Sequence, residues 1–298
     1  METPFFLIAD ADSVFTPETI GWLVQQFQDE SIGAVAGIVE VGNRDSWLGS
    51  CQALEYIVSQ SIIRRAQEVF DGILVVPGAV GAWRTAAVRK AGLFSGNTVT
   101  EDADLTVAVH RAGYRVVFQE QARSVTEAPA SARDFMRQRL RWTFGMLQTS
   151  WKHRGAIAEG RTVGYISIVD AIWFGVLSSL LAPLVDLFLV VLLVQGIWAI
   201  AANDVALIAS VPPALVLAYF ALTALDVINA LVAFWFEKRF DWWLLFLVPF
   251  LRFGYRQLLY ISTIRALLQA MTGTVAHWNK LDRTGNVLSF WSPAKKNV

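Results

Sequence analysis

The order of hydrophobic and polar positions divides this chain into two parts. Before residue 162, short apolar stretches alternate with amphipathic segments, which is the pattern of an α/β domain. The apolar stretches predict buried strands, and the amphipathic segments between them predict helices. We expect the strands at residues 5–8, 34–41, 73–76 and 114–118. We expect the helices at residues 16–27, 46–70, 102–113 and 131–153.

Capping residues predict where two of these helices begin. Thr16 is the expected N-cap of the first helix, with Pro17 at its first helical position. Ser131 is the expected N-cap of the last one, and Asp134 stands three residues later in a variant of the capping box.

The second part, residues 163–271, is far more apolar. Before residue 200 its only charged side chains are Asp170 and Asp186. The length and number of these stretches argue against buried helices of a soluble protein and for integration in a membrane. We therefore expect three regions in chain order: the α/β domain at 1–162, interfacial and transmembrane helices at 163–271, and a tail at 272–298.

Breaks in the apolar pattern suggest how this second part meets the bilayer. Pro183 divides the first stretch, so we expect an interfacial helix at 165–180, then spans at about 183–202 and 206–236. The third stretch, 242–270, is interrupted by three arginines and could span or lie flat. These arginines are Arg252, Arg256 and Arg265.

Composition supports the membrane interpretation and excludes other classes. Hydrophobic residues make up 55% of the 298 and charged ones 17%, whereas soluble proteins carry about 25% charged residues. The net charge of zero gives no reason to expect a nucleic-acid partner. A single cysteine, Cys51, excludes an intramolecular disulfide.

Loop charge predicts the orientation. Lys238 and Arg239 follow the second span, while the loop at 201–204 has no positive charge, so the positive-inside rule puts residues 237–239 in the cytoplasm. With two crossings before that loop, the α/β domain is cytoplasmic too. The basic tail favours the same side, and hence a flat 242–270. A third span with an exported tail is the alternative. The basic tail residues are Lys280, Arg283, Lys295 and Lys296.

Two carboxylates follow the first strand in the stretch LIADADSVF. In an extended chain Asp10 and Asp12 face the same side and repel each other unless a cation or proton lies between them. This predicts a divalent-metal site at the end of the strand. A solvated Asp-Ser turn is the alternative.

Three further acids, Glu101, Asp102 and Asp104, stand at a predicted helix start, where the helix dipole stabilises negative charge. A carboxylate that stays ionised beside a cleft is a competent general base. For Glu101 and Asp104 an ordinary helix-start role is equally open.

The helix from Ser131 carries the stretch QRLRW. Gln138, Arg141 and Trp142 share one face, where Arg suits phosphate and Trp offers a flat surface to a sugar ring. An amphipathic surface helix with a buried Trp is the alternative. We expect Arg137 and Arg139 to face solvent or lipid headgroups. A glycine-rich stretch, PGAVGAWR at 77–84, would let a bulky ligand approach the backbone closely.

The order of DAD, TED and QRLRW, followed by hydrophobic spans, resembles the processive family 2 glycosyltransferases. This membrane-bound group includes cellulose, chitin, hyaluronan and poly-N-acetylglucosamine synthases. The stretch TEAP at 126–129 matches the same family. PFLRFGYRQLLY at 249–260 and HWNKLDRTGNV at 277–287 look most like its bacterial poly-N-acetylglucosamine branch, which includes enzymes fused to polysaccharide deacetylases.

The resemblance implies a GT-A-like nucleotide-sugar-binding domain and a role for each motif. Asp10 and Asp12 would hold the donor diphosphate through Mg²⁺ or Mn²⁺, and Asp102, with Glu101 beside it at the substrate, would be the catalytic base. The QRLRW residues would grip the diphosphate and support the acceptor sugar. These residues are Gln138, Arg141 and Trp142.

The implied function is inverting transfer of a sugar, foremost N-acetylglucosamine, from a UDP-sugar to a growing β-linked polysaccharide. The enzyme would be a multi-pass protein of the bacterial inner (plasma) membrane, with a cytoplasmic catalytic domain and a polysaccharide deacetylase as a further partner. A non-processive transferase acting on a lipid-linked sugar and a catalytically weak membrane scaffold are the alternatives.

The chain begins on the strand that delivers Asp10, so no earlier βαβ unit completes a nucleotide crevice. We therefore expect an N-terminally incomplete domain, the C-terminal part of a longer enzyme, which binds UDP-sugar poorly alone.

Overall fold

The computed structural model describes residues 3–203, 213–238 and 241–273. A mixed five-stranded sheet runs in the order β1-β4-β3-β5-β2. Its strands are β1 (Phe5–Ile8), β2 (Val14–Phe15), β3 (Ile32–Val41), β4 (Gly81–Arg84) and β5 (Arg115–Thr126). Strand β3 is parallel to β5 and antiparallel to β4, and β1 is antiparallel to β4. The predicted α/β architecture is confirmed.

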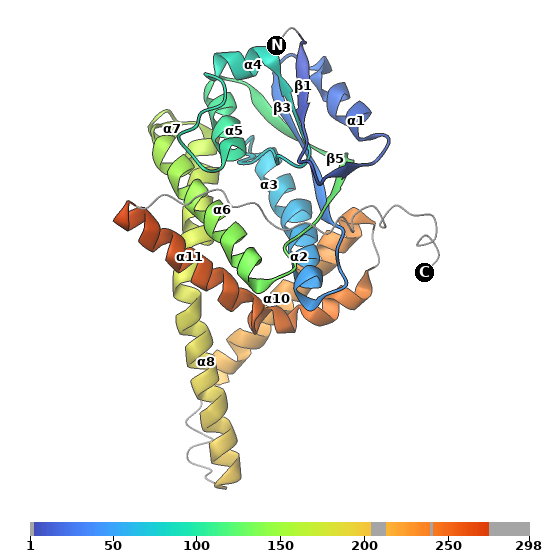
Figure 1. Cartoon of the computed structure of the whole chain (residues 1–298). Coiled ribbons are helices and arrows are strands. Elements are labelled where there is room, and N and C mark those ends of the chain that lie inside the picture. The colour runs from blue at the N-terminus through green and yellow to red at the C-terminus, as the bar shows by residue number, and fades with distance from the viewer. Residues whose placement is uncertain (1–2, 204–212, 239–240, 274–298) are drawn as a thin grey trace.

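Helices cover both faces of this sheet because β3 alternates its side chains between two cores. Ala34, Ala36 and Ile38 pack against α4 (Thr85–Lys90) and α5 (Glu101–Arg111). Val35 and Val39 face the opposite core, to which α1 (Thr19–Gln25) contributes. The further helices of this half are α2 (Trp47–Val58), α3 (Arg64–Val69), α6 (Ala132–Lys152) and α7 (Gly155–Ala158) (Figure 1).

Two local predictions are wrong. Residues 73–76 form no strand, although Ile73, Leu74 and Val76 are buried. Side chains of the helix at 101–111 take up backbone groups of this segment: the Val76 amide donates to Thr106, and the Ile73 carbonyl bonds to His110. The strand forms later, at β4. Helix α1 begins at Thr19 after Glu18, since the Thr16 hydroxyl bonds to the Thr19 hydroxyl at 2.7 Å instead of capping a helix at Pro17.

Two other helix predictions are confirmed. The helix expected over 46–70 is continuous from Trp47 to Val69, with a π-helical turn at Ser59–Ile63 joining α2 to α3. Ser131 caps α6 by accepting a 3.1 Å hydrogen bond from the Asp134 amide. The first turns of α2 and α6 are both capped by a polar side chain that is close in sequence, and such a cap can be recognised from the sequence alone.

The apolar part contains two helices long and apolar enough to cross a membrane, Val163–Ala201 and Leu217–Glu237. The first is continuous: two π-helical stretches, Val163–Ile168 and Ala171–Leu177, lead into α8 (Ser178–Ala201), which contains Pro183. The predicted division at Pro183 is therefore wrong, because a proline inside an apolar helix removes one hydrogen bond without ending the helix. In Figure 1, α8 projects away from the sheet.

Helix α10 (Pro213–Glu237) returns to the sheet domain, where Ala230 and Phe234 pack against Leu54 and Ile57 of α2. Residues 206–212 of the predicted second span lie outside the described residues, as do residues 274–298 of the predicted tail with its four basic side chains.

The third apolar segment is bent by 54° between Trp242–Arg252 and α11 (Tyr255–Thr272). Helix α11 packs along α6, through Tyr255 on Phe135 and Ala266 on Phe144 (Figure 1). Arg252 and Arg256 both bond to Asp226 of α10, at 2.9 and 3.1 Å. This segment packs on α6 of the sheet domain and also contacts α8, where Nε2 of Gln257 donates to Asp186 at 3.1 Å. By length and composition, the bent pair also qualifies as a third span.

Candidate active site

Asp10 and Asp12 lie in a tight turn directly after β1. The Ser13 amide donates to the Asp10 carbonyl at 3.0 Å, which closes the turn. Asp10 is exposed and Asp12 is half-buried. The strand ends at Ile8, so the strand alternation that predicted a shared face does not apply to these two residues; the turn sets their geometry.

Gly78 lies next to this turn. Antiparallel pairing puts Ile8 opposite Gly81, so the loop before β4 meets the end of β1. A Cβ atom on Gly78 would lie 3.4 Å from Oδ1 of Asp10. The Gly78 amide also donates a hydrogen bond to the Asp102 carboxylate. Gly78 therefore lies between the DAD turn and Asp102.

Asp102 stands in the first turn of α5. Its Oδ1 accepts a 2.8 Å hydrogen bond from the Ala103 amide. Burial raises the pKa of Asp102 to about 6; the Glu101 charge adds to the rise, while the Ala103 amide, Arg141 and the Gly78 amide oppose it. The helix start thus does not by itself hold the pKa low, because the loss of water outweighs the dipole.

The other two acids of this turn have different surroundings. Glu101 is exposed beside Asp102. Asp104 is buried and bonds to Lys152 at 2.7 Å and to His153 at 2.8 Å, at the far end of α6. Those two partners lower the pKa of Asp104 despite its burial. Asp104 therefore joins α5 to α6, a role that neither the site interpretation nor the helix-start interpretation predicted.

The QRLRW residues approach the TED loop from α6. Nη1 of Arg141 lies 3.4 Å from the Val99 carbonyl, and its charge acts on Asp102. Gln138 is buried, with no hydrogen-bond partner for its Oε1 among the described residues. Trp142 is half-buried, with the Arg139 guanidinium 4.8 Å from its ring centre.

Two residues of α6 that the sequence analysis did not single out hold Val99 and Thr100, the two residues before α5. These residues and the start of α5 are called the TED loop. Gln148 accepts a 3.0 Å hydrogen bond from the Val99 amide. Gly145 packs so closely on Thr100 that an added Cβ would lie 2.4 Å from its side chain. A glycine inside a strong helical pattern was the available signal for this contact.

Arg64 was also missed. Its Nη1 donates to the Gly37 carbonyl at 2.6 Å and to Gln60 at 3.2 Å. Burial lowers the pKa of Arg64 to about 10, and the Asp102 charge partly offsets this effect. The cation follows the π-helical turn Ser59–Ile63, and such turns are frequent near functional sites. A second cation besides Arg141 thus acts on the Asp102 carboxylate.

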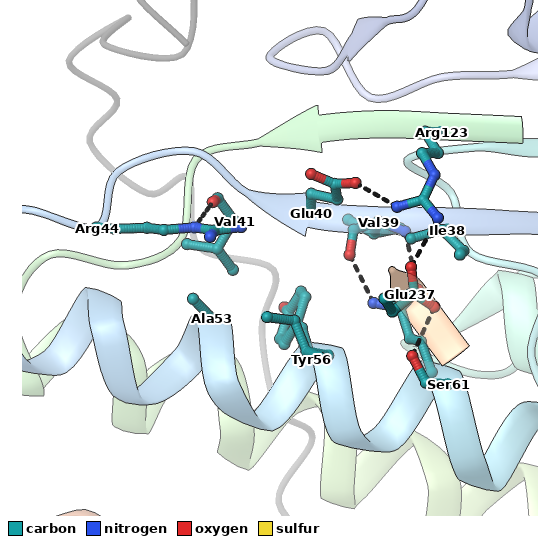
Figure 2. Close-up of a pocket in the computed structure, with 12 residues that line it drawn as sticks. Ile38, Val39, Glu40, Val41, Arg44, Ala53, Tyr56, Ser61, Arg123 and Glu237 are labelled. Atoms are coloured by element: carbon teal, nitrogen blue, oxygen red, sulfur yellow. Dashed lines mark hydrogen bonds and ion pairs between the residues drawn. The ribbon is translucent and has the colours of Figure 1, made fainter. Parts of the chain in front are cut away.

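A separate pocket between β3, α2 and the end of α10 contains none of the predicted site residues (Figure 2). Ion pairs fill it: Arg123 bonds to Glu40 at 2.8 Å and to Glu237 at 2.7 Å, and Ser61 bonds to Glu237 at 2.6 Å. This cluster is a structural joint that ties α10 to the sheet.

The donor set fits a divalent ion that is completed by substrate. In the parts of the chain that the structure describes, no three His, Cys, Asp or Glu side chains gather closely enough to hold a metal. Mg²⁺ is usually bound by one or two carboxylates plus substrate phosphates and water, and the exposed DAD turn offers two carboxylates. Asp10 and Asp12 therefore fit a metal that arrives with a diphosphate.

A family model described as glycosyl transferase family group 2 matches residues 5–275, most of the chain. The chain belongs to this family. The family 2 resemblance inferred from DAD, TED and QRLRW is thereby confirmed. Among solved structures, the mannosyltransferase PcManGT from Pyrobaculum calidifontis, in complex with GDP-Man and Mn²⁺, has a TM-score of 0.52. At 18% identity over 91% of this chain and 63% of that one, it supports the GT-A-like fold alone.

Curated relatives include the poly-beta-1,6-N-acetyl-D-glucosamine synthases of Staphylococcus aureus strain COL and Staphylococcus epidermidis. The chain is 26% and 25% identical to them over 142 residues, 47% of its own length. The match spans 34% of the length of each relative.

Proposed function

We propose that this glycosyltransferase moves N-acetylglucosamine from UDP-N-acetylglucosamine to the end of a β-linked polysaccharide, with inversion at the anomeric carbon. The observation that carries the proposal is the meeting of the DAD turn, the Gly78 amide and Asp102, with the Arg141 charge beside them. The choice of sugar follows from the two staphylococcal relatives.

Asp102 acts as the base. Its carboxylate takes the proton of the acceptor hydroxyl while that oxygen bonds to the anomeric carbon and the bond from that carbon to the diphosphate breaks. One positioned base is sufficient for a direct displacement, whereas glycoside hydrolysis uses two carboxyl groups. A pKa near 6 suits this role, because the group is ionised at neutral pH and is still basic enough to accept a proton.

The leaving diphosphate carries the developing negative charge. Asp10 and Asp12 would hold Mg²⁺ or Mn²⁺, which when bound neutralises this charge. Arg141, on the Asp102 side, supplies a guanidinium fork that suits phosphate oxygens. Gln138 lies on α6, the helix of Arg141, and Glu101 lies on α5, the helix of Asp102. We assign both to substrate binding.

Trp142 provides a flat apolar surface for the terminal sugar of the acceptor, beside Arg141 on the same helix. A surface of this kind favours a chain that stays bound between additions, which supports a polysaccharide acceptor over a single lipid-linked sugar.

Helix packing supports a cytoplasmic catalytic domain on a multi-pass bacterial plasma-membrane protein. The Glu237 contacts with Arg123 and Ser61 hold the end of α10 on the sheet domain, so Lys238, the next residue, lies on the same side as that domain. The packing of α11 along α6 favours an interfacial 242–270. A polysaccharide deacetylase remains our proposed partner, on the likeness of residues 249–260 and 277–287 alone.

The test is transfer of radiolabelled sugar into polymer by membrane vesicles that carry the enzyme as the cell makes it. We expect incorporation from UDP-N-acetylglucosamine, and none from UDP-glucose or GDP-mannose. EDTA should abolish it, and Mg²⁺ or Mn²⁺ should restore it. Incorporation that survives exhaustive chelation would return Asp10 and Asp12 to the solvated-turn interpretation, and preference for another donor would overturn the sugar assignment.

A further inference from the structure

Arg139 lies in the QRLRW stretch. The sequence pattern predicted that it faces solvent or lipid headgroups, and this prediction is wrong. Its side chain is only 11% exposed. Both of its terminal nitrogens donate to the Glu55 carboxylate of α2, at 2.7 and 2.8 Å. The Tyr255 hydroxyl of α11 donates to the same carboxylate. Helices α2, α6 and α11 therefore meet at the Glu55 carboxylate, which holds the Arg139 guanidinium.

The guanidinium also contacts aromatic rings of its own helix. Its carbon lies 4.8 Å from the centre of the Trp142 ring and 4.9 Å from that of Phe135. Burial has the largest single effect and lowers the pKa of Arg139, but the Glu55 charge and hydrogen bond, together with Tyr255 and Tyr56, outweigh it and the net shift is upward. Arg139 thus remains a cation beside Trp142 at every physiological pH.

We propose that Arg139 is a positioning residue that sets the orientation of the Trp142 ring, and that Glu55 and Tyr255 hold Arg139 for this purpose. The two-pronged bond to Glu55 fixes the guanidinium plane, and a cation in a fixed position restricts how the indole lies against it. The inference rests on the proposed acceptor role of Trp142. It adds that α2 and α11 control the acceptor end of the site.

The test measures two Michaelis constants in membrane vesicles, one for an N-acetylglucosamine oligomer of fixed length and one for UDP-N-acetylglucosamine. Arg139→Gln should raise the acceptor KM about five- to tenfold, the size of one partly buried cation–π contact, with the donor KM within twofold. Arg139→Lys keeps the charge but not the fork, and should recover part of the loss. Tyr255→Phe, which removes one hydroxyl, should raise the acceptor KM less.

Arg137→Gln is the matched control. This arginine lies two residues away on the same helix, is 44% exposed and approaches Asp134 at 3.5 Å, so both constants should stay unchanged. Glu55→Gln, which retains the shape and an amide oxygen, serves as the second variant if Arg139→Gln does not fold.

Combination with Trp142→Ala separates positioning from a general structural role. If Arg139 acts through the indole, Arg139→Gln adds no further increase in acceptor KM once Trp142 is gone. An equal increase in both backgrounds, or a parallel rise in donor KM, overturns the inference while leaving the proposed function intact. A normal acceptor KM in Trp142→Ala alone overturns the acceptor role itself.

Discussion

Asp102 and Asp104 stand two residues apart in α5, yet they face regions of opposite character. Asp102 receives hydrogen bonds from the Ala103 and Gly78 amides, and burial raises its pKa to about 6. Asp104 is held by the Lys152 ammonium and the His153 ring, and these bonds lower its pKa. Both carboxylates lose water, so the difference between them comes from what replaces it.

This contrast explains why one helix start serves two purposes. The Asp104 charge is balanced by its bonds to Lys152 and His153, and these bonds connect α5 to the end of α6. The Asp102 charge is only partly balanced, which costs stability but leaves a group that gains by accepting a proton.

The largest effect should come from Asp102→Asn. Loss of a positioned base typically lowers the rate by about 10²–10⁴, and we expect this decrease in sugar transfer. Because the native site disfavours the Asp102 charge at neutral pH, the variant should unfold at the same temperature as the wild type or higher. Transfer assays and thermal unfolding in detergent check the two parts. A variant that retains transfer, or that loses stability, would contradict the contrast with Asp104.

The pH profile should give the next largest effect. A base with a pKa of about 6 loses its active form tenfold for each unit below that value, so transfer should be about tenfold lower at pH 5 than its plateau. The effect on stability has the opposite sign. Below pH 3.8, the ordinary pKa of an aspartate, the raised pKa of Asp102 favours the folded state, and this contribution is lost as the pH rises through 6. Initial rates from pH 4.5 to 8 test the activity, and a rate that is constant down to pH 5 would refute the assignment.

Gly145→Ala should have a smaller effect at the same site. The new methyl group would lie 2.4 Å from the Thr100 side chain, so α6 must move away from the TED loop. Such overpacking costs about 1–3 kcal/mol of unfolding free energy, and we expect transfer to fall severalfold. Gly175→Ala, in the helix Val163–Ala201, is the control, since beyond that helix's own neighbouring backbone no atom lies within 4 Å of the methyl position.

Asp104→Asn should change transfer least. Removing a charged partner of Lys152 and His153 should cost about 1–3 kcal/mol of unfolding free energy, seen as a lower melting temperature. Transfer per folded molecule should stay within about twofold, because Asp104 faces away from the base. A decrease as large as that of Asp102→Asn would place both acids in the chemistry.

The sequence predicted most reliably those features that depend on residues close together in the chain. The starts of α2 and α6 depend on Ser46 and Ser131, each of which accepts a hydrogen bond from an amide three residues later. The motif acids and QRLRW could be found because their residue types are unusual for a core. Helix α5 was predicted within one residue of its true start.

The missed features depend on distant partners. Arg139 is buried because it bonds to Glu55, 84 positions away, and Tyr255, 200 positions from Glu55, bonds to the same carboxylate. Helical spacing alone places that arginine on a polar surface. In the same way, the pairing of β1 with β4, not the alternation of residues 7–12, brings the DAD turn to Gly78.

The helix Val163–Ala201 has a mechanical consequence. Thirty-nine residues at about 1.5 Å each give a rod about 58 Å long, nearly twice the roughly 30 Å of bilayer hydrocarbon. Its first turns are packed in the core, because Val163 and Ile168 belong to the same hydrophobic cluster as Leu74 and as Val107, which lies in α5. A tilt of this rod would therefore also move α5, the helix that carries Asp102.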